Sequence, residues 1–187
     1  MRKILYALFT VVMFSASSLV QANESPSHAS EYHKLDSTEL NEVKHKSAFT
    51  LLVPENIPNG WTVELKCPYP LDTTKAIQYV RLHYFDKDEN YMFGIEQHKA
   101  IGYKSKKEQT SIDVRNNTSE TKIVEEDFKF DTSGEIIKYN ELEARFTPGA
   151  DTTLGGFLRW IQDGTYIEID SPELSKRKMI KIAKSMK

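Results

Sequence analysis

Short runs in which apolar and polar residues alternate recur through most of the chain, and they set its fold class. Alternation with a period of two places one set of side chains on each face of a β-strand. The clearest example is residues 155–162 followed by residues 165–169, because these two runs flank Asp163-Gly164. That dipeptide accepts the positive φ angles of a two-residue type I′ turn. The pattern therefore predicts a β-hairpin and antiparallel pairing.

Further runs of the same kind extend the predicted sheet. They cover residues 49–53, 61–66, 76–85, 91–98, 121–130, 135–139 and 142–146. A charged turn at residues 86–90 joins two of these runs into a second hairpin. Residues 99–120 differ, because they are polar and hold no sustained period. We expect this segment to be a mobile loop.

Two helices complete the predicted fold. Residues 37–46 carry acidic residues early and basic residues late, an order that suits a short helix. After Ser171-Pro172 the chain becomes a basic amphipathic helix, which can bind a membrane surface or dock on the sheet. We favour docking, because the apolar stripe is narrow and lacks aromatic residues. The expected fold is α+β: an antiparallel sheet of about six to eight strands, a C-terminal helix packed on one face, and a short N-terminal helix.

The N-terminus has the three parts of a secretory signal peptide. Arg2 and Lys3 precede an uncharged apolar run, and small residues follow up to Ala22. We expect cleavage between Ala22 and Asn23. The organisation is then a signal peptide at 1–22, a flexible leader at 23–36 and a single α+β domain at 37–187, secreted or extracytoplasmic and without a transmembrane span. An uncleaved membrane anchor is the alternative.

Charge and cysteine content exclude several classes of protein. The chain has 25 Lys and Arg against 27 Asp and Glu, a net charge of −2, whereas a general nucleic-acid binder needs a strong basic excess. Its single cysteine excludes an intramolecular disulfide and a cysteine-rich zinc site. We expect Cys67 to be a buried, unreactive thiol and the protein to be a monomer.

Two segments resemble a known family. One is residues 49–61, with its Pro54, Pro58, Gly60 and Trp61 turn; the other is residues 158–166, with the segment 174–186 at the end. They are similar to a domain of unknown function common at the C-termini of exported and membrane-anchored Bacillus-type proteins, some of them anti-sigma factors. The resemblance covers roughly residues 46–187 and implies a fold but no reaction. Asn140-Glu141 stands where such domains often have Asn-Gly.

The sequence offers no catalytic or metal-binding motif. It contains no His-Glu-x-x-His, no Gly-x-Ser-x-Gly and no phosphate-binding glycine loop. Hairpin pairing would separate His83 from His98 by roughly 16 Å, too far for one ion. Glu141 and Glu143 could form an acid/base pair on one face of a strand, but that spacing is equally typical of a solvent-facing strand. We predict no catalytic residue, no cofactor and no metal.

Aromatic residues are more numerous than one short helix can cover. We expect Trp160 in the core and Trp61 and Tyr69 at the rim of a groove for an apolar or peptide-like ligand, although all three could be core residues. The favoured function is an exported, non-catalytic binding or sensing module with an unknown ligand. Two alternatives stay open: an envelope-associated structural or interaction protein that contacts an envelope component, and a hydrolase with a dispersed active site.

Overall fold

The computed structural model describes residues 33–68, 74–150 and 154–187. The predicted cleavage site at Ala22 and Asn23, most of the predicted leader, and Tyr69 lie outside these residues. The helices are α1 (Ser37–Lys46) and α2 (Lys176–Ala183). The strands are β1 (His33–Lys34), β2 (Thr62–Cys67), β3 (Tyr79–Phe85), β4 (Tyr91–Lys99), β5 (Lys104–Asp113), β6 (Thr118–Asp127), β7 (Glu135–Tyr139), β8 (Leu142–Pro148), β9 (Gly156–Gln162) and β10 (Thr165–Ser171).

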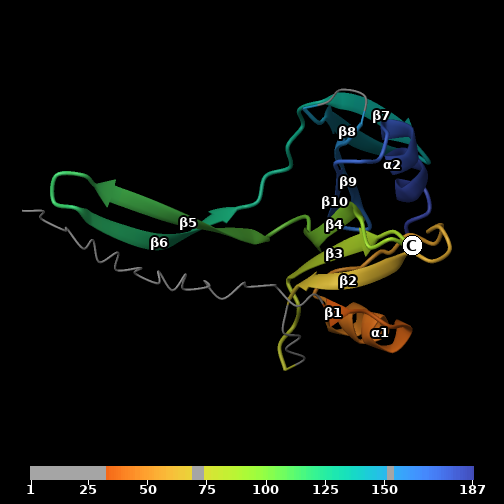
Figure 1. Cartoon of the computed structure of the whole chain (residues 1–187), viewed down its shortest axis with the longest axis horizontal. Helices are drawn as coiled ribbons and strands as arrows, with labels where there is room; N and C mark the ends of the chain where they lie inside the picture. Colours follow the sequence, from red (N-terminus) through yellow and green to blue (C-terminus); the bar gives the residue numbers. More distant parts are fainter. Residues whose placement is uncertain (1–32, 69–73, 151–153) are drawn as a thin grey trace, which may run out of the picture. The chain divides into compact units, whose positions relative to one another are not determined.

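Eight of the strands form one antiparallel sheet in the order β1-β2-β3-β4-β10-β9-β8-β7, and β5 and β6 form a separate two-stranded sheet (Figure 1). The chain leaves β4 to build the β5–β6 hairpin and then β7, β8 and β9. β10 then returns to pair with β4 in the middle of the large sheet. This arrangement confirms the predicted α+β class with an antiparallel sheet.

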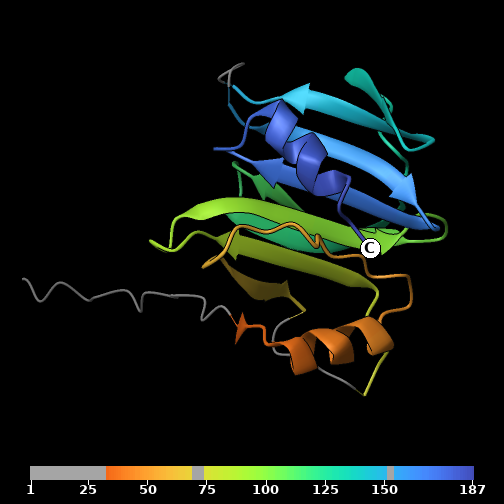
Figure 2. The same ribbon diagram turned by 90° about the vertical axis from the view of Figure 1, so that its right-hand side faces the viewer.

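Rows of paired residues alternate between the two faces of the sheet. Leu82, Ile95, Ile169 and Leu158 are register partners on four adjacent strands, and all four are fully buried. Directly paired residues share a face, so this row defines the covered face. Figure 2 shows α2 and the chain segment that precedes β2 lying across that face. The apolar side of α2 contributes Met179, Ile182 and Ala183 to the core.

A buried glutamine holds the segment before β2 against the sheet. Gln97 on β4 is fully buried, and its side-chain oxygen accepts a hydrogen bond of 2.9 Å from the Leu52 backbone N–H. Its amide nitrogen donates to the Leu52 carbonyl at 2.7 Å. Thr165 on β10 donates to the Thr50 carbonyl at 2.9 Å. A strand-like segment that lies on a sheet face has backbone groups without ladder partners, and these side chains satisfy them.

Both helices are short. The α1 helix has ten residues and begins with a capping box, in which Asp36 and Glu39 bond each other's backbone N–H groups. The α2 helix has eight residues. Within the described residues, neither helix is long and apolar enough to cross a membrane.

The segment predicted as a loop at residues 99–120 is a hairpin arm instead. β5 and β6 pair over ten residues each, from Lys104↔Asp127 to Asp113↔Thr118. Their large apolar residues are exposed, Ile112 at 71% and Ile123 at 66% of their surface. Because water reaches both faces of this hairpin, neither face needed an apolar row, and the period-two signal of a half-buried strand is absent.

Two hairpins of the large sheet allow a matched test of turn chemistry. The Asp163-Gly164 turn has φ angles of 51° and 76°, as predicted for type I′, and Asn140-Glu141 has φ angles of 44° and 63°. Glutamate is strained at a positive φ angle, whereas glycine is not. We expect Glu141→Gly to stabilise the fold by about 1 kcal/mol and Gly164→Ala, which meets no neighbouring atom, to destabilise it by about 1 kcal/mol.

Urea unfolding of the two variants beside the parent protein measures both changes. Opposite signs at the two turns are the expected result. A loss of stability in Glu141→Gly would show that the Glu141 side chain contributes more than its backbone strain costs.

Candidate binding pocket

A row of charged residues crosses the face of the sheet opposite α2. Arg81 on β3 pairs with Glu96 on β4, Glu96 with Glu168 on β10, and Glu168 with Arg159 on β9. Period-two alternation puts this row on the open face, because the neighbouring row of Leu82 and its partners points into the core. Two carboxylates therefore stand side by side in the centre of the sheet, each with a guanidinium group on its outer side.

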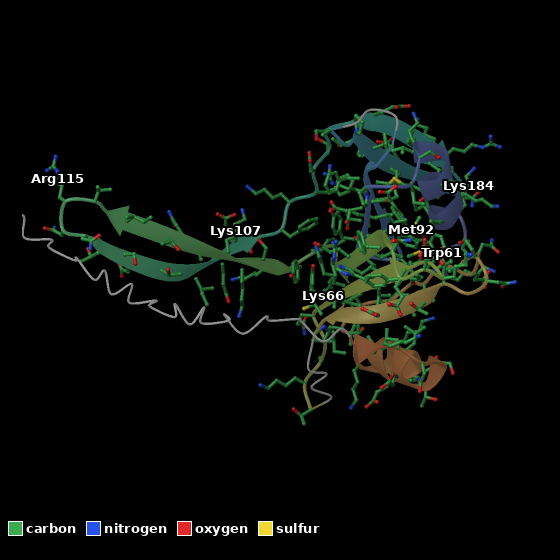
Figure 3. The ribbon with its side chains drawn as sticks, viewed as in Figure 1. Trp61, Lys66, Met92, Lys107, Arg115 and Lys184 are labelled. Carbon is green, nitrogen blue, oxygen red and sulfur yellow. The ribbon has the colours of Figure 1, made fainter. Side chains whose placement is uncertain are left out.

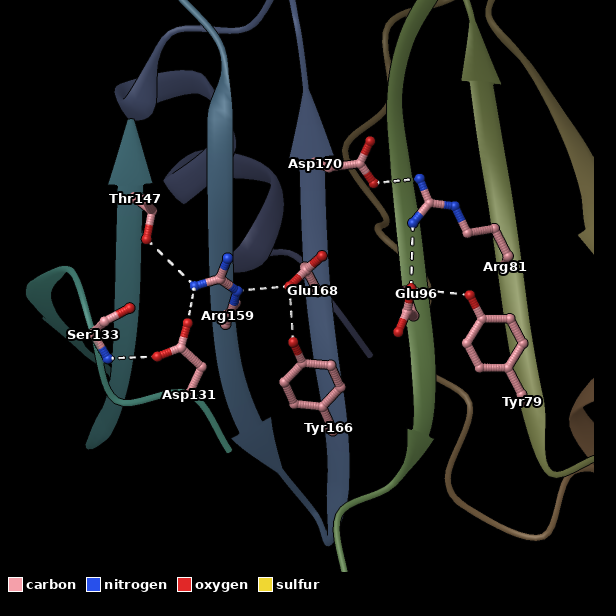
Figure 4. Close-up of polar contacts among 10 residues, drawn as sticks. All are labelled: Tyr79, Arg81, Glu96, Asp131, Ser133, Thr147, Arg159, Tyr166, Glu168 and Asp170. Carbon is pink, nitrogen blue, oxygen red and sulfur yellow. Dashed lines mark hydrogen bonds and ion pairs between the residues drawn. The ribbon is translucent and has the colours of Figure 1, made fainter. Parts of the chain in front are cut away.

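The two halves of this row have the same bonding pattern (Figure 4). On one side, the Tyr79 hydroxyl donates to Glu96 Oε2 at 2.9 Å, and Arg81 lies 3.5 Å from the same oxygen. On the other side, the Tyr166 hydroxyl donates to Glu168 Oε2 at 2.8 Å, and the Arg159 Nε donates to it at 2.6 Å. Each carboxylate is thus held by one phenol and one guanidinium.

Each guanidinium group also serves a second carboxylate. Arg81 contacts Asp170, and Arg159 contacts Asp131 at 3.1 Å. The two arginines therefore face four carboxylates, and the network carries two excess negative charges. Burial raises the pKa of Glu96; the bond from Tyr79 lowers that pKa, and nearby Glu168 raises it. Glu96 also has the longer contact with its arginine, 3.5 Å against 2.6 Å for Glu168.

Beside the charged row, aromatic rings gather around His98, at the end of β4. The His98 ring stacks on Tyr103 with 3.8 Å between ring centroids and on Tyr166 with 4.8 Å. Phe128 meets His98 edge-on at 4.4 Å. His98 is buried, its Nδ1 donates to the Lys99 carbonyl at 2.9 Å, and burial lowers its pKa. The buried imidazole therefore acts as a neutral platform for its neighbours.

Tyr103 and Phe128 belong to the base of the β5–β6 hairpin. The Phe128 backbone N–H donates to the Tyr103 carbonyl at 2.9 Å, which closes the hairpin just before β5 and just after β6. Because both rings pack on His98, the hairpin base is fixed to the open face of the large sheet. The hairpin thereby supplies one wall of a site whose floor is the sheet.

An open pocket of about 860 Å³ lies between this floor and wall. The sheet lines it with Cys67, Tyr79, Glu96, His98 and Tyr166, and the hairpin base lines it with Tyr103 and Phe128, among others. His98 and Tyr166 are buried, whereas Tyr79, Tyr103 and Phe128 are only half-buried. The rings of these last three residues are the apolar surface that remains available to a ligand.

The residues that the sequence suggested for a groove lie elsewhere or are not described. Trp61 is half-buried and packs against Phe93 of the core, with ring centroids 6.1 Å apart. In Figure 3 it lies well apart from the hairpin residues Lys107 and Arg115. Tyr69 lies outside the described residues, so the rim role of this pair stays a prediction.

The two histidines weighed as metal ligands share the open face but are offset along it. His83 pairs with Gly94 and His98 with Tyr79, so they stand four residues apart along the register. Across residues 33–68, 74–150 and 154–187, no three His, Cys, Asp or Glu side chains are grouped in a way that could hold a metal ion.

Sequence reasoning missed most of the pocket. Tyr79, Glu96 and Tyr166 lie at alternate positions of predicted strands, on the face expected to be polar. This placement was the signal that could have identified them. The hairpin wall could not be placed because residues 99–120 were assigned to a loop.

Cys67 gives a chemical readout of this pocket. The thiol is half-buried rather than buried, and burial, followed by the charge of Glu96, raises its pKa above the usual value. The thiolate is the reactive form. We therefore expect iodoacetamide to label the native protein more slowly than a free cysteine at pH 7, with a rate that still rises above pH 9. The guanidinium-unfolded chain is the control, and a native rate that levels off below pH 9 would contradict the expectation.

The fold and the pocket define an α+β sheet domain with an open, aromatic-lined cavity on its uncovered face. A family model described as a domain of unknown function, DUF4367, matches residues 52–186, and the chain belongs to this family. The match confirms that the chain contains a domain of unknown function, as the sequence resemblance indicated. No curated protein and no solved structure matches the chain.

Proposed function

We propose that this protein is an exported, non-catalytic binding or sensing module whose ligand occupies the pocket between the sheet and the hairpin base. The observation that carries the proposal is the set of half-buried rings of Tyr79, Tyr103 and Phe128 around a volume of about 860 Å³. Cavities of this size with aromatic walls and a few converging polar groups are typical of small-molecule sites. The expected ligand is apolar or peptide-like, with a polar group that reaches Glu96.

The bonding of the carboxylates favours binding over hydrolysis. Glu96 and Glu168 are each engaged by a tyrosine hydroxyl and an arginine, which holds them in fixed positions as acceptors. A general base needs a carboxylate that can take a proton from substrate or water. Two carboxylates held in this way suit a rigid recognition surface better than a proton-transfer pair.

Export is part of the proposal and rests on the N-terminal sequence. Arg2-Lys3, the apolar run and the small residues up to Ala22 support removal of residues 1–22. Mature protein that begins at Asn23 is the expected result of N-terminal sequencing. Recovery of chains with an intact Met1 in the membrane fraction would contradict export by cleavage.

A neutral fluorescent probe tests whether the pocket binds apolar molecules. N-phenyl-1-naphthylamine brightens when it leaves water for an apolar site, and we expect saturable binding of one equivalent. Tyr103→Ala and Phe128→Ala should each weaken this binding about tenfold, because each removes a wall ring. Ile112→Ala, on the exposed part of the hairpin, should leave it unchanged. Equal binding by all four proteins would place the probe elsewhere and overturn the proposal.

A further inference from the structure

The pocket combines two features that attract the same kind of ligand. Tyr79, Tyr103 and Phe128 expose ring surface, and the carboxylate of Glu96 belongs to the same lining. The face of an aromatic ring is electronegative, so it attracts an organic cation, and a carboxylate beside the rings adds to this attraction. A neutral apolar ligand would use the rings but not the charge.

The bonding of Glu96 leaves one of its oxygens available. The Tyr79 hydroxyl and the Arg81 guanidinium both contact Oε2. Among the described residues, none donates a hydrogen bond to Oε1. The Glu96 side chain is 27% exposed, so water or a ligand reaches it. An N–H donor or a quaternary ammonium group in the pocket would meet this oxygen.

The charge balance of the network around Arg81 and Arg159 favours a cation as well, and the adjoining ion pair of Arg145 with Glu143 leaves that balance unchanged. Arg81 is shared between Glu96 and Asp170, and Arg159 between Glu168 and Asp131, so four carboxylates face two guanidinium groups. At the pocket mouth, Lys104 and Lys106 stand against Glu125, so these lysines offset one of the two excess negative charges and leave the other. Lys106 pairs with Glu125 at 3.5 Å, and the Lys104 side chain is exposed to water. One more cation beside Glu96 would reduce the excess negative charge.

We propose that the pocket selects an organic ammonium ion, with its alkyl part against Tyr79, Tyr103 and Phe128 and its charged nitrogen beside Glu96 Oε1. This inference rests on the proposed binding function and names the chemistry of its ligand. The ammonium group can belong to a free small molecule or to the lysine side chain of a peptide, because both present a nitrogen cation on an apolar stem.

Pairs of probes with the same shape and different charge test the inference. Choline and its neutral isostere 3,3-dimethylbutan-1-ol represent a free small-molecule ammonium ion. Acetyl-Gly-Lys-Gly-amide and the same peptide with norleucine represent a peptide. NMR titration of the full-length protein should show at least one cation binding about tenfold more tightly than its neutral isostere, and the pair with the larger ratio identifies the source.

Glu96→Gln is the key variant, because it removes the charge and keeps the shape. It should abolish the preference for the cation while N-phenyl-1-naphthylamine still binds. Glu120→Gln, on the exposed part of β6, is the matched control and should keep the preference. Equal affinity for cation and isostere, no binding of either, or an unchanged preference in Glu96→Gln would overturn the inference. Retained binding of the neutral probe would show that the proposed function survives this failure.

Discussion

Replacing Trp160 with alanine is expected to lower the free energy of unfolding by about 4 kcal/mol. Trp160 is the largest fully buried side chain, and it lies on β9 on the covered face, in register with Ile167. Its indole N–H donates to the Gln162 side chain at 3.2 Å, so the substitution removes a hydrogen bond as well as leaving a cavity. Urea unfolding followed by far-ultraviolet circular dichroism measures the loss.

The second tryptophan is the matched control. Trp61 is half-buried and packs on Phe93, so Trp61→Ala should cost less than half as much. The chain has two tryptophans, so Trp61→Phe isolates the emission of Trp160, and Trp160→Phe isolates the emission of Trp61. Trp160 alone should emit in the blue and resist iodide, whereas Trp61 alone should emit further to the red and be quenched. A larger loss at Trp61 would contradict this division between core and periphery.

Gln97→Leu is expected to cost about 3 kcal/mol despite the similar size and greater hydrophobicity of leucine. The substitution leaves the N–H and the carbonyl of Leu52 without partners inside the covered face. Each such buried group costs about 1–3 kcal/mol, and burial of the leucine methyl groups offsets part of the sum. Hydrogen exchange should show the same effect locally, through faster exchange of the Leu52 amide.

The same substitution on the hairpin separates this cause from a general effect of removing glutamine. Gln109 lies on β5 with its side chain exposed, so Gln109→Leu should change stability by less than about 0.5 kcal/mol. If Gln97→Leu proved as mild as Gln109→Leu, the segment before β2 would not depend on Gln97 for its position.

The large sheet could be predicted because burial imposed a pattern on its sequence. Rows such as Leu82 and Ile95 must face the core, so apolar residues recur at every second position. The turn at Asp163-Gly164 was equally clear, because its backbone needs residues that accept positive φ angles. What these local signals could not give was the pairing of β4 with β10, which joins strands far apart in the chain.

The hairpin arm and the pocket were missed for a related reason. β5 and β6 face water on both sides, so burial imposed no sustained period-two pattern on residues 104–120, and only the run at 121–130 indicated part of β6. A weaker signal was present in their charges, since Lys106 and Lys107 on β5 form ion pairs with Glu125 and Glu126 on β6. Without the hairpin, Tyr103 and Phe128 could not be placed against His98.

The charged row could not be predicted, because it depends on the same long-range pairing of β10 with β4. Arg81 with Glu96 and Arg159 with Glu168 each lie within a local hairpin, and their spacing could be anticipated. Their combination into one row depends on β10 returning to β4, which places Glu168 directly beside Glu96. Of the Glu141 and Glu143 pair that the sequence offered, Glu141 lies in the turn before β8, and Glu143 contacts Arg145, the register partner of Arg159, at 2.7 Å.

Native mass spectrometry of the protein isolated from its exported compartment tests the pocket most directly. The intact protein should carry a bound small molecule or peptide of defined mass under gentle ionisation. A variant that combines Tyr103→Ala with Phe128→Ala should lose this adduct and keep its folded charge-state distribution, because the core lies on the other face of the sheet. A parent protein that appears only at the mass of its bare chain, or an adduct equally abundant in both proteins, would contradict the assignment of the pocket as the ligand site.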